Sequence, residues 1–262
     1  MVRMKRSTRR FIALVLGLTA ACATTDDTPR TGDQPGSPSE SVELPPIQLP
    51  LAELPDDWRT LPADAFARDL DARPERFTFD EPTRASLRAA LEETDVTGDR
   101  AAILLARSGS SGELLLEHLE ARRRFETRGG DASSVIAAAG LRRYAPDREW
   151  GARLARLVVG PVAHPDLEVR VECAISAIAH GSTAPLPFLV AVCRIDTWEG
   201  RSDTLDFEPA RTTAWARERA AECLSRAAGI ANDYRADASL VERQASVRRF
   251  AEALKVTLPV EL

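Results

Sequence analysis

The chain has 262 residues, of which 44% are hydrophobic and 5% aromatic, and its formal net charge is −5. Its apolar residues are mostly Ala, Leu and Val, which suit closely packed helices, and no run of alternating β-branched residues between tight turns argues for a sheet. Without the basic residues 1–21 there remain 30 basic and 40 acidic groups, which weighs against nucleic acid or an anionic membrane surface as the main partner. We therefore expect an all-α protein that binds no nucleic acid.

The first 21 residues have the features of a bacterial export signal. Five basic residues and no acidic one accompany the apolar run FIALVLGLTA, which is too short to span a bilayer as a stable helix. The run leads into LTAAC, which resembles a lipobox, although Thr19 stands where that motif usually has Leu. The resemblance implies a signal peptide over 1–21 and a lipid on Cys22, the new N-terminus. The alternatives are an ordinary signal peptide cut near Ala21 and a twin-arginine signal at Arg9-Arg10.

Residues 22–52 are rich in Pro, Thr, Ser and Asp, with too little apolar surface to offset chain entropy. We expect a disordered tether that holds the folded part away from a membrane. Ala23, directly after the cysteine, resembles the residues that permit sorting to the outer membrane in Gram-negative lipoproteins. Bulky residues return over 53–80, which predicts a short segment, with a helix around Pro62–Leu70, packed on the domain that follows.

From Glu81 to the end at 262 the pattern is helical and roughly repetitive. Breaks with Gly or Ser-Gly separate the segments, and a polar loop around Trp198 makes the longest gap. The predicted helices are Glu81–Glu93, Gly98–Arg107, Ser111–Phe125, Asp131–Tyr144, Asp147–Val159, Pro165–His180, Pro185–Arg194, Glu208–Ala228 and Leu240–Lys255.

The helix predicted for Pro165–His180 is the most apolar of these segments. At 100° per residue its apolar side chains cover well over half the circumference, while Glu172, Ser176 and His180 share one narrow polar strip. Such a helix must be covered on more than one side, so we expect helical neighbours before and after it.

The segment HPDLEVR at 164–170 resembles the opening of the first helix of a HEAT repeat, Asp-Pro-x-Val-Arg, with Leu167 in place of the Pro. LPFLVAV at 186–192 is similar to the paired second helix, and looser copies occur over 101–119 and 220–254. The resemblance implies a HEAT-like α-solenoid over 81–262, of about four helix pairs. It also implies a fold that presents surfaces to partners, and it implies no catalytic residues. We separately expect no cofactor and no metal.

Three cysteines remain besides Cys22. Cys173 could form a disulfide with Cys193 on the paired helix, or with Cys223 on the next first helix. The alternative, which we favour, is that all three are small core residues. No C-x-x-C or H-x₃-H spacing indicates a metal site with His180.

The other polar candidates also have structural interpretations. We expect His118 on a solvated helix face with Arg122, His164 at a position that caps the helix after it, and His180 near a helix C-terminus, where its positive form suits the dipole. Arg122, Arg123 and Arg124 could contact an acidic partner or form a solvated helix end. Trp198 and Trp215 could contact a partner, or Trp198 could cover the last helix pair.

Together these observations predict a non-catalytic interaction or assembly scaffold, held by its lipid on the bacterial outer membrane and bound to an unidentified envelope protein. One alternative is a HEAT-like lyase or small-molecule-binding protein, which would bring His180, Cys173 and an acidic side chain into one cavity. The other is a structural envelope lipoprotein, whose surface would lack an apolar patch of several hundred Å².

Overall fold

The protein is described by a computed structural model over residues 51–52, 58–59, 76–93, 95–122, 132–194 and 207–257. The predicted signal peptide, nearly all of the predicted tether, the helix expected around 62–70 and the polar loop lie outside these residues. So do four predicted site residues, which are Cys22, Arg123, Arg124 and Trp198.

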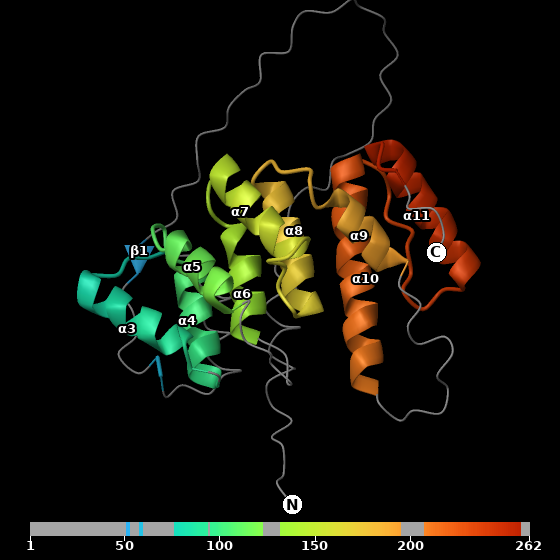
Figure 1. Cartoon of the computed structure of the whole chain (residues 1–262). Coiled ribbons are helices and arrows are strands. Elements are labelled where there is room, and N and C mark those ends of the chain that lie inside the picture. The colour runs from blue at the N-terminus through green and yellow to red at the C-terminus, as the bar shows by residue number, and fades with distance from the viewer. Residues whose placement is uncertain are drawn as a thin grey trace, which may run out of the picture.

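The described part is all-helical apart from one two-residue strand pair, which confirms the all-α prediction (Figure 1). Strands β1 (Leu51–Ala52) and β2 (Arg76–Phe77) pair in parallel. All nine predicted helices are present in the described ranges, with ends within three residues of those expected. They are α3 (Glu81–Leu91), α4 (Val96–Ala106), α5 (Gly112–Arg122), α6 (Ala132–Leu141), α7 (Arg148–Val158), α8 (Leu167–Ala179), α9 (Leu186–Cys193), α10 (Phe207–Ala228) and α11 (Leu240–Leu254).

Side-chain caps explain where several of these helices begin. Asp80, Asp95 and Asp147 each accept a backbone N–H from the first turn of α3, α4 and α7. Helix α8 is capped by Asp166, whose Oδ1 accepts the Val169 N–H at 3.1 Å. The expectation that His164 itself caps this helix was therefore wrong. His164 is buried just before the cap, where its Nδ1 accepts the Asp166 N–H at 3.1 Å.

The helices pack in chain order (Figure 1). Among the described helices, every substantial contact joins elements one or two places apart in the chain. Helix α4 packs on α6, α6 on α8 and α8 on α10, while α5 contacts α7 and α9 contacts α11. The even-numbered helices therefore form a row, and the odd-numbered helices α5, α7, α9 and α11 lie against it.

Glycines inside two helices allow close contacts between neighbours. A Cβ atom on Gly140 in α6 would lie 2.3 Å from the Cβ of Ala106 in α4. This distance is shorter than two non-bonded carbon atoms can approach, so the position requires glycine. A Cβ atom on Gly151 in α7 would lie 3.0 Å from the carbonyl oxygen of His180. These glycines, which break the sequence pattern of their helices, are points where two backbones approach each other.

Part of the segment before α3 belongs to the same core. Trp58, Phe77 and Phe79 are buried, and the rings of Phe77 and Phe79 stack 6.1 Å apart. The Phe77 N–H donates to the carbonyl of Arg107 at 3.1 Å, just after α4 ends.

No helix in the described ranges is both long and apolar enough to cross a membrane.

Candidate functional site

The polar strip of α8 faces neighbouring helices rather than solvent. Glu172 and Ser176 have no exposed surface, and His180 is 1% exposed. The Ser176 hydroxyl donates to the carbonyl of Ala138 in α6 at 2.5 Å. The strip is therefore as buried as the apolar faces, and each of its groups needs a polar partner inside the protein.

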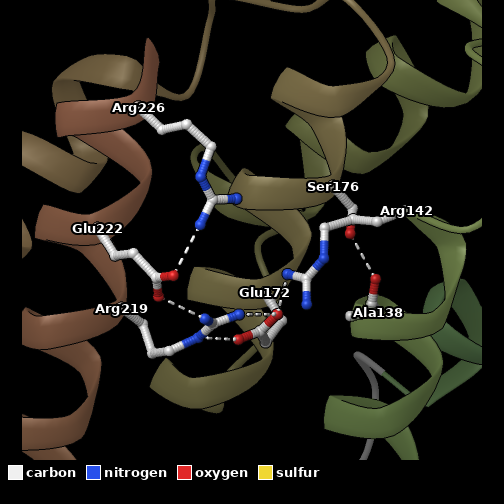
Figure 2. A network of polar contacts seen from close by, with 7 residues as sticks. All are labelled: Ala138, Arg142, Glu172, Ser176, Arg219, Glu222 and Arg226. Atoms are coloured by element: carbon white, nitrogen blue, oxygen red, sulfur yellow. Dashed lines mark hydrogen bonds and ion pairs between the residues drawn. The ribbon is translucent and has the colours of Figure 1, made fainter. Parts of the chain in front are cut away.

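Glu172 finds its partners on both neighbouring helices (Figure 2). Arg142, at the end of α6, donates from Nη1 to Oε2 of Glu172. Arg219, in α10, donates from Nε to Oε1 at 2.9 Å and from Nη2 to Oε2 at 3.4 Å. One buried carboxylate thus joins α6, α8 and α10 through two guanidinium groups.

The two arginines keep Glu172 ionised. Burial by itself raises the pKa of this carboxyl, but the charges of Arg142 and Arg219 and their hydrogen bonds outweigh burial, so the pKa lies below its ordinary value of 4.5. Burial likewise acts to lower the pKa of Arg219, and the carboxylates of Glu172 and Glu222 raise it overall. The cluster is a charged network at neutral pH.

A second, more exposed layer of charge lies beside this pair (Figure 2). Glu222 accepts from Arg219 Nη1 at 2.8 Å and from Arg226 Nη2 at 2.7 Å. The side chains of Glu222 and Arg226 are 42% and 61% exposed, against 12% for Arg219. The charge network therefore runs from the buried centre to the surface of α10.

A small hollow, open to solvent, lies over this network. The space that it encloses is about 10 Å³, enough for roughly one water-sized group. The hollow is lined by Arg142, Ile175, Arg219, Glu222, Cys223 and Arg226. Because it lies over the charge network, we take it as the candidate functional site.

The other end of the strip, at His180, has a different chemistry. Nδ1 of His180 accepts the Asp147 N–H at 2.9 Å, and Nε2 lies 3.0 Å from the carbonyl oxygen of Leu141. An Nδ1 acceptor requires the neutral ring, with the proton on Nε2 donated to Leu141. The ring of Trp150 packs edge-on against it at 5.6 Å. His180 does lie at the C-terminus of α8, as expected. The positive form expected there was wrong, because the ring links α8 to the α6–α7 turn as a neutral group.

The three described cysteines are free and buried. Burial raises the pKa of all three thiols, to about 11 for Cys223 and further for Cys173 and Cys193. Such thiols stay protonated and unreactive at neutral pH. Neither the Cys173–Cys193 nor the Cys173–Cys223 bond is formed in the structure, and all three cysteines lie in the core, as the alternative interpretation expects.

From the sequence, His118 is expected on a solvated helix face. This expectation was wrong, because the residue is buried, with 3% of its surface exposed. Its Nε2 lies 3.4 Å from the hydroxyls of Ser133 and Ser134 in α6, and its Nδ1 lies 3.7 Å from Glu92. These residue types also occur in hydrolytic triads. Here both serines are buried, at 4% and 0% exposure, so the cluster links helices and presents no accessible nucleophile.

The remaining predicted site residues are not brought together. Arg122 is the last residue of α5, and its side chain lies outside the described residues. Trp215 is half-buried and packs against the core. His180 and Cys173 do not line the hollow described above, whose cysteine is Cys223. Among the described residues, no group of three or more His, Cys, Asp or Glu side chains is placed to hold a metal ion.

Sequence reasoning placed Glu172 on the polar strip of its helix without assigning it a site, and it missed Arg142 and Arg219. The signal was partly available, because a carboxylate on an otherwise apolar helix requires cationic partners when it is buried. The partners lie 30 and 47 positions away, and the chain has many other arginines. Only the packing of α6 and α10 on α8 selects these two.

Comparisons of the chain with protein-family models, with curated proteins and with solved structures find no significant match.

Proposed function

We propose that this chain is a lipid-anchored, HEAT-like helical-repeat protein of the bacterial envelope that binds a protein partner and does not catalyse a reaction. In this proposal Cys22 carries the lipid, residues 22–52 form a flexible tether to the outer membrane, and the helices form a short solenoid of about four pairs. The partner is an envelope protein, on the periplasmic or the outer side.

The observation that carries the solenoid proposal is the packing order of the helices. Substantial contacts between described helices join elements one or two places apart, which is the contact pattern of stacked helix pairs. Helix α8 is covered on both sides by α6 and α10, as a central repeat requires.

The residues that resemble a HEAT repeat also have the structural roles that such a motif needs. Asp166 caps α8 through the Val169 N–H. Arg170 donates from Nε to the carbonyl of Val158, at the end of α7, at 2.8 Å, and its guanidinium lies 4.6 Å from the ring centroid of Phe188 in α9. One arginine of the motif thus contacts the helices before and after its own, which supports a repeat at this position.

The described surface offers few apolar side chains to a partner. The large exposed apolar residues among the described ones are Val159, Ile230 and Val241. A partner that docks on the described surface would therefore meet mainly polar groups. The same scarcity favours a second candidate, a structural envelope lipoprotein without a specific partner.

Crosslinking in membranes of the native organism, followed by purification of the full-length chain, separates the two candidates. The scaffold proposal predicts that the same protein partner is crosslinked in repeated experiments. Its yield is expected to fall when Trp198 is replaced by Ala, or when Arg122, Arg123 and Arg124 are replaced by Gln. A matched control replaces the exposed Arg235, which pairs with Asp237 on the surface. Recovery of lipids alone, with all variants alike, would contradict the scaffold and leave the structural role.

Lipid attachment has its own test. Incorporation of labelled palmitate into the full-length chain, and its loss in Cys22→Ala, is the expected result. Release of an unlabelled wild-type chain from the membrane by salt would contradict the anchor while leaving the helical scaffold open to test.

A further inference from the structure

We infer that the hollow between α6, α8 and α10 is a binding site for a carboxylate group, held by the guanidinium groups of Arg142 and Arg226. This inference is separate from the scaffold proposal, because it concerns the chemistry of one site and not the class of protein. It rests on the charge around the hollow, on the unused donors there and on the rigidity of its base.

The hollow carries an excess of positive charge. Three guanidinium groups line it, from Arg142, Arg219 and Arg226, and Glu222 is the only carboxylate among its lining residues. The buried carboxylate of Glu172 lies beneath, between Arg142 and Arg219. Counted with Glu172, the cluster has three positive and two negative charges, so one further negative charge would neutralise it.

Two of these arginines have donors to spare. Arg142 donates from Nη1 to Glu172, and Arg226 donates from Nη2 to Glu222. These are the contacts that the two side chains make with described residues, although a guanidinium has five N–H groups. Arg219 differs, because its Nε, Nη1 and Nη2 all donate to Glu172 or Glu222. As far as contacts with described residues go, the unused donors therefore lie on Arg142 and Arg226, which follow or belong to different helices.

The base of the site is held in place before any ligand arrives. Glu172 has no exposed surface and fixes Arg142 and Arg219, whose side chains are 16% and 12% exposed. An arginine already oriented by a buried carboxylate loses little side-chain entropy when it binds a second anion. The exposed Glu222 is the internal competitor, because it occupies Arg226 through an ion pair of the kind that contributes little to stability.

Charge and hydrogen-bond geometry select the type of anion. A single excess positive charge matches a monoanion. Guanidinium groups also bind carboxylates through paired N–H donors, which gives the interaction a defined geometry.

The test uses the full-length chain with isotope-labelled arginine and follows the side-chain N–H signals of Arg142 and Arg226 by NMR. Titration with acetate, at constant ionic strength against chloride, is expected to shift both signals with one saturating curve. Inorganic phosphate is the second probe and is expected to bind more weakly. No saturable shift with acetate, or tighter binding of phosphate, would overturn the carboxylate assignment.

Two variants make the result specific to this site. Glu222→Gln removes the internal competitor and is expected to tighten acetate binding by about 2- to 5-fold, since an exposed ion pair is of that size. Arg226→Gln is expected to abolish the saturable shift at Arg142. Both replaced side chains are themselves exposed, and circular dichroism verifies the helix content.

The matched control is Glu81→Gln, which removes the partner of Arg84 in another exposed ion pair, on α3. It is expected to leave acetate binding unchanged. Equal tightening in Glu81→Gln and Glu222→Gln would show a general effect of net charge and would overturn the proposed site.

Discussion

The two ends of the polar strip on α8 both bury a polar side chain, but they satisfy its hydrogen bonds in different ways. Glu172 is buried as an ion and needs two arginines from two other helices. His180 is equally buried but neutral, and it needs only a backbone N–H and a backbone carbonyl from the α6–α7 turn. The loss of folding stability on removing each side chain should therefore depend on the groups left without a partner. At Glu172 these are two charged guanidinium groups, and at His180 they are two neutral backbone groups.

The largest effect is expected at the charged end. Glu172→Gln leaves Arg142 and Arg219 partly buried without their shared anion and should lower the free energy of unfolding by about 3–5 kcal/mol. Urea unfolding followed by circular dichroism measures this loss.

A triple variant provides the control for this prediction. Replacing Glu172, Arg142 and Arg219 together by Met removes all three charges, so its stability should lie close to that of the wild type. If Glu172→Gln and the triple variant lost the same stability, the loss would come from packing and not from stranded charge.

Acid should weaken the same end of the strip. The pKa of Glu172 in the folded protein lies below its ordinary value of 4.5, so the stability it contributes is present above that pH and is lost as the pH falls through the folded-state pKa. Wild type should therefore lose stability more steeply than the triple Met variant in this range. Parallel curves in a pH series of urea unfolding would contradict an ionised Glu172.

The neutral end should be less sensitive. His180→Leu leaves the Asp147 N–H and the Leu141 carbonyl without their partner and should cost about 1–3 kcal/mol. His180→Gln, which retains a donor and an acceptor, should recover part of that loss in the same unfolding experiment. A loss at His180 that exceeds the loss at Glu172 would reverse the comparison.

The smallest effect is expected between the two ends. Ser176→Ala removes one neutral hydrogen bond to the carbonyl of Ala138 and should cost about 1 kcal/mol. Since Ala occupies slightly less space and favours helices, no other contact should change. The unfolding midpoint should shift without a change in the denaturant slope, and a changed slope would indicate that more than one bond was lost.

The sequence was sufficient to predict the helices because their signals are local. Aspartates at the starts of α3, α7 and α8, apolar spacing and terminal glycines such as Gly181 and Gly229 all act within a few residues. The same spacing predicted that the helix after Pro165 would be covered on more than one side, as it is by α6, α7, α9 and α10.

The sequence was not sufficient to predict the polar contacts because they join distant positions. A strip with Glu172, Ser176 and His180 has the same helical spacing whether it faces solvent or a neighbouring helix. His118 was misplaced for this reason, since its partners Ser133 and Ser134 lie on the next helix. The role of Gly140 is likewise visible only in the fold, where it allows the close contact with Ala106.

Hydrogen exchange of the backbone amides tests the central claim most directly, which is that α8 is enclosed within a series of stacked helices. Stacked repeats open from their ends, so the amides of α6 and α8 should exchange slowest, and those of α3 and α11 faster. Exchange in α8 as fast as in α3 and α11 would contradict the account.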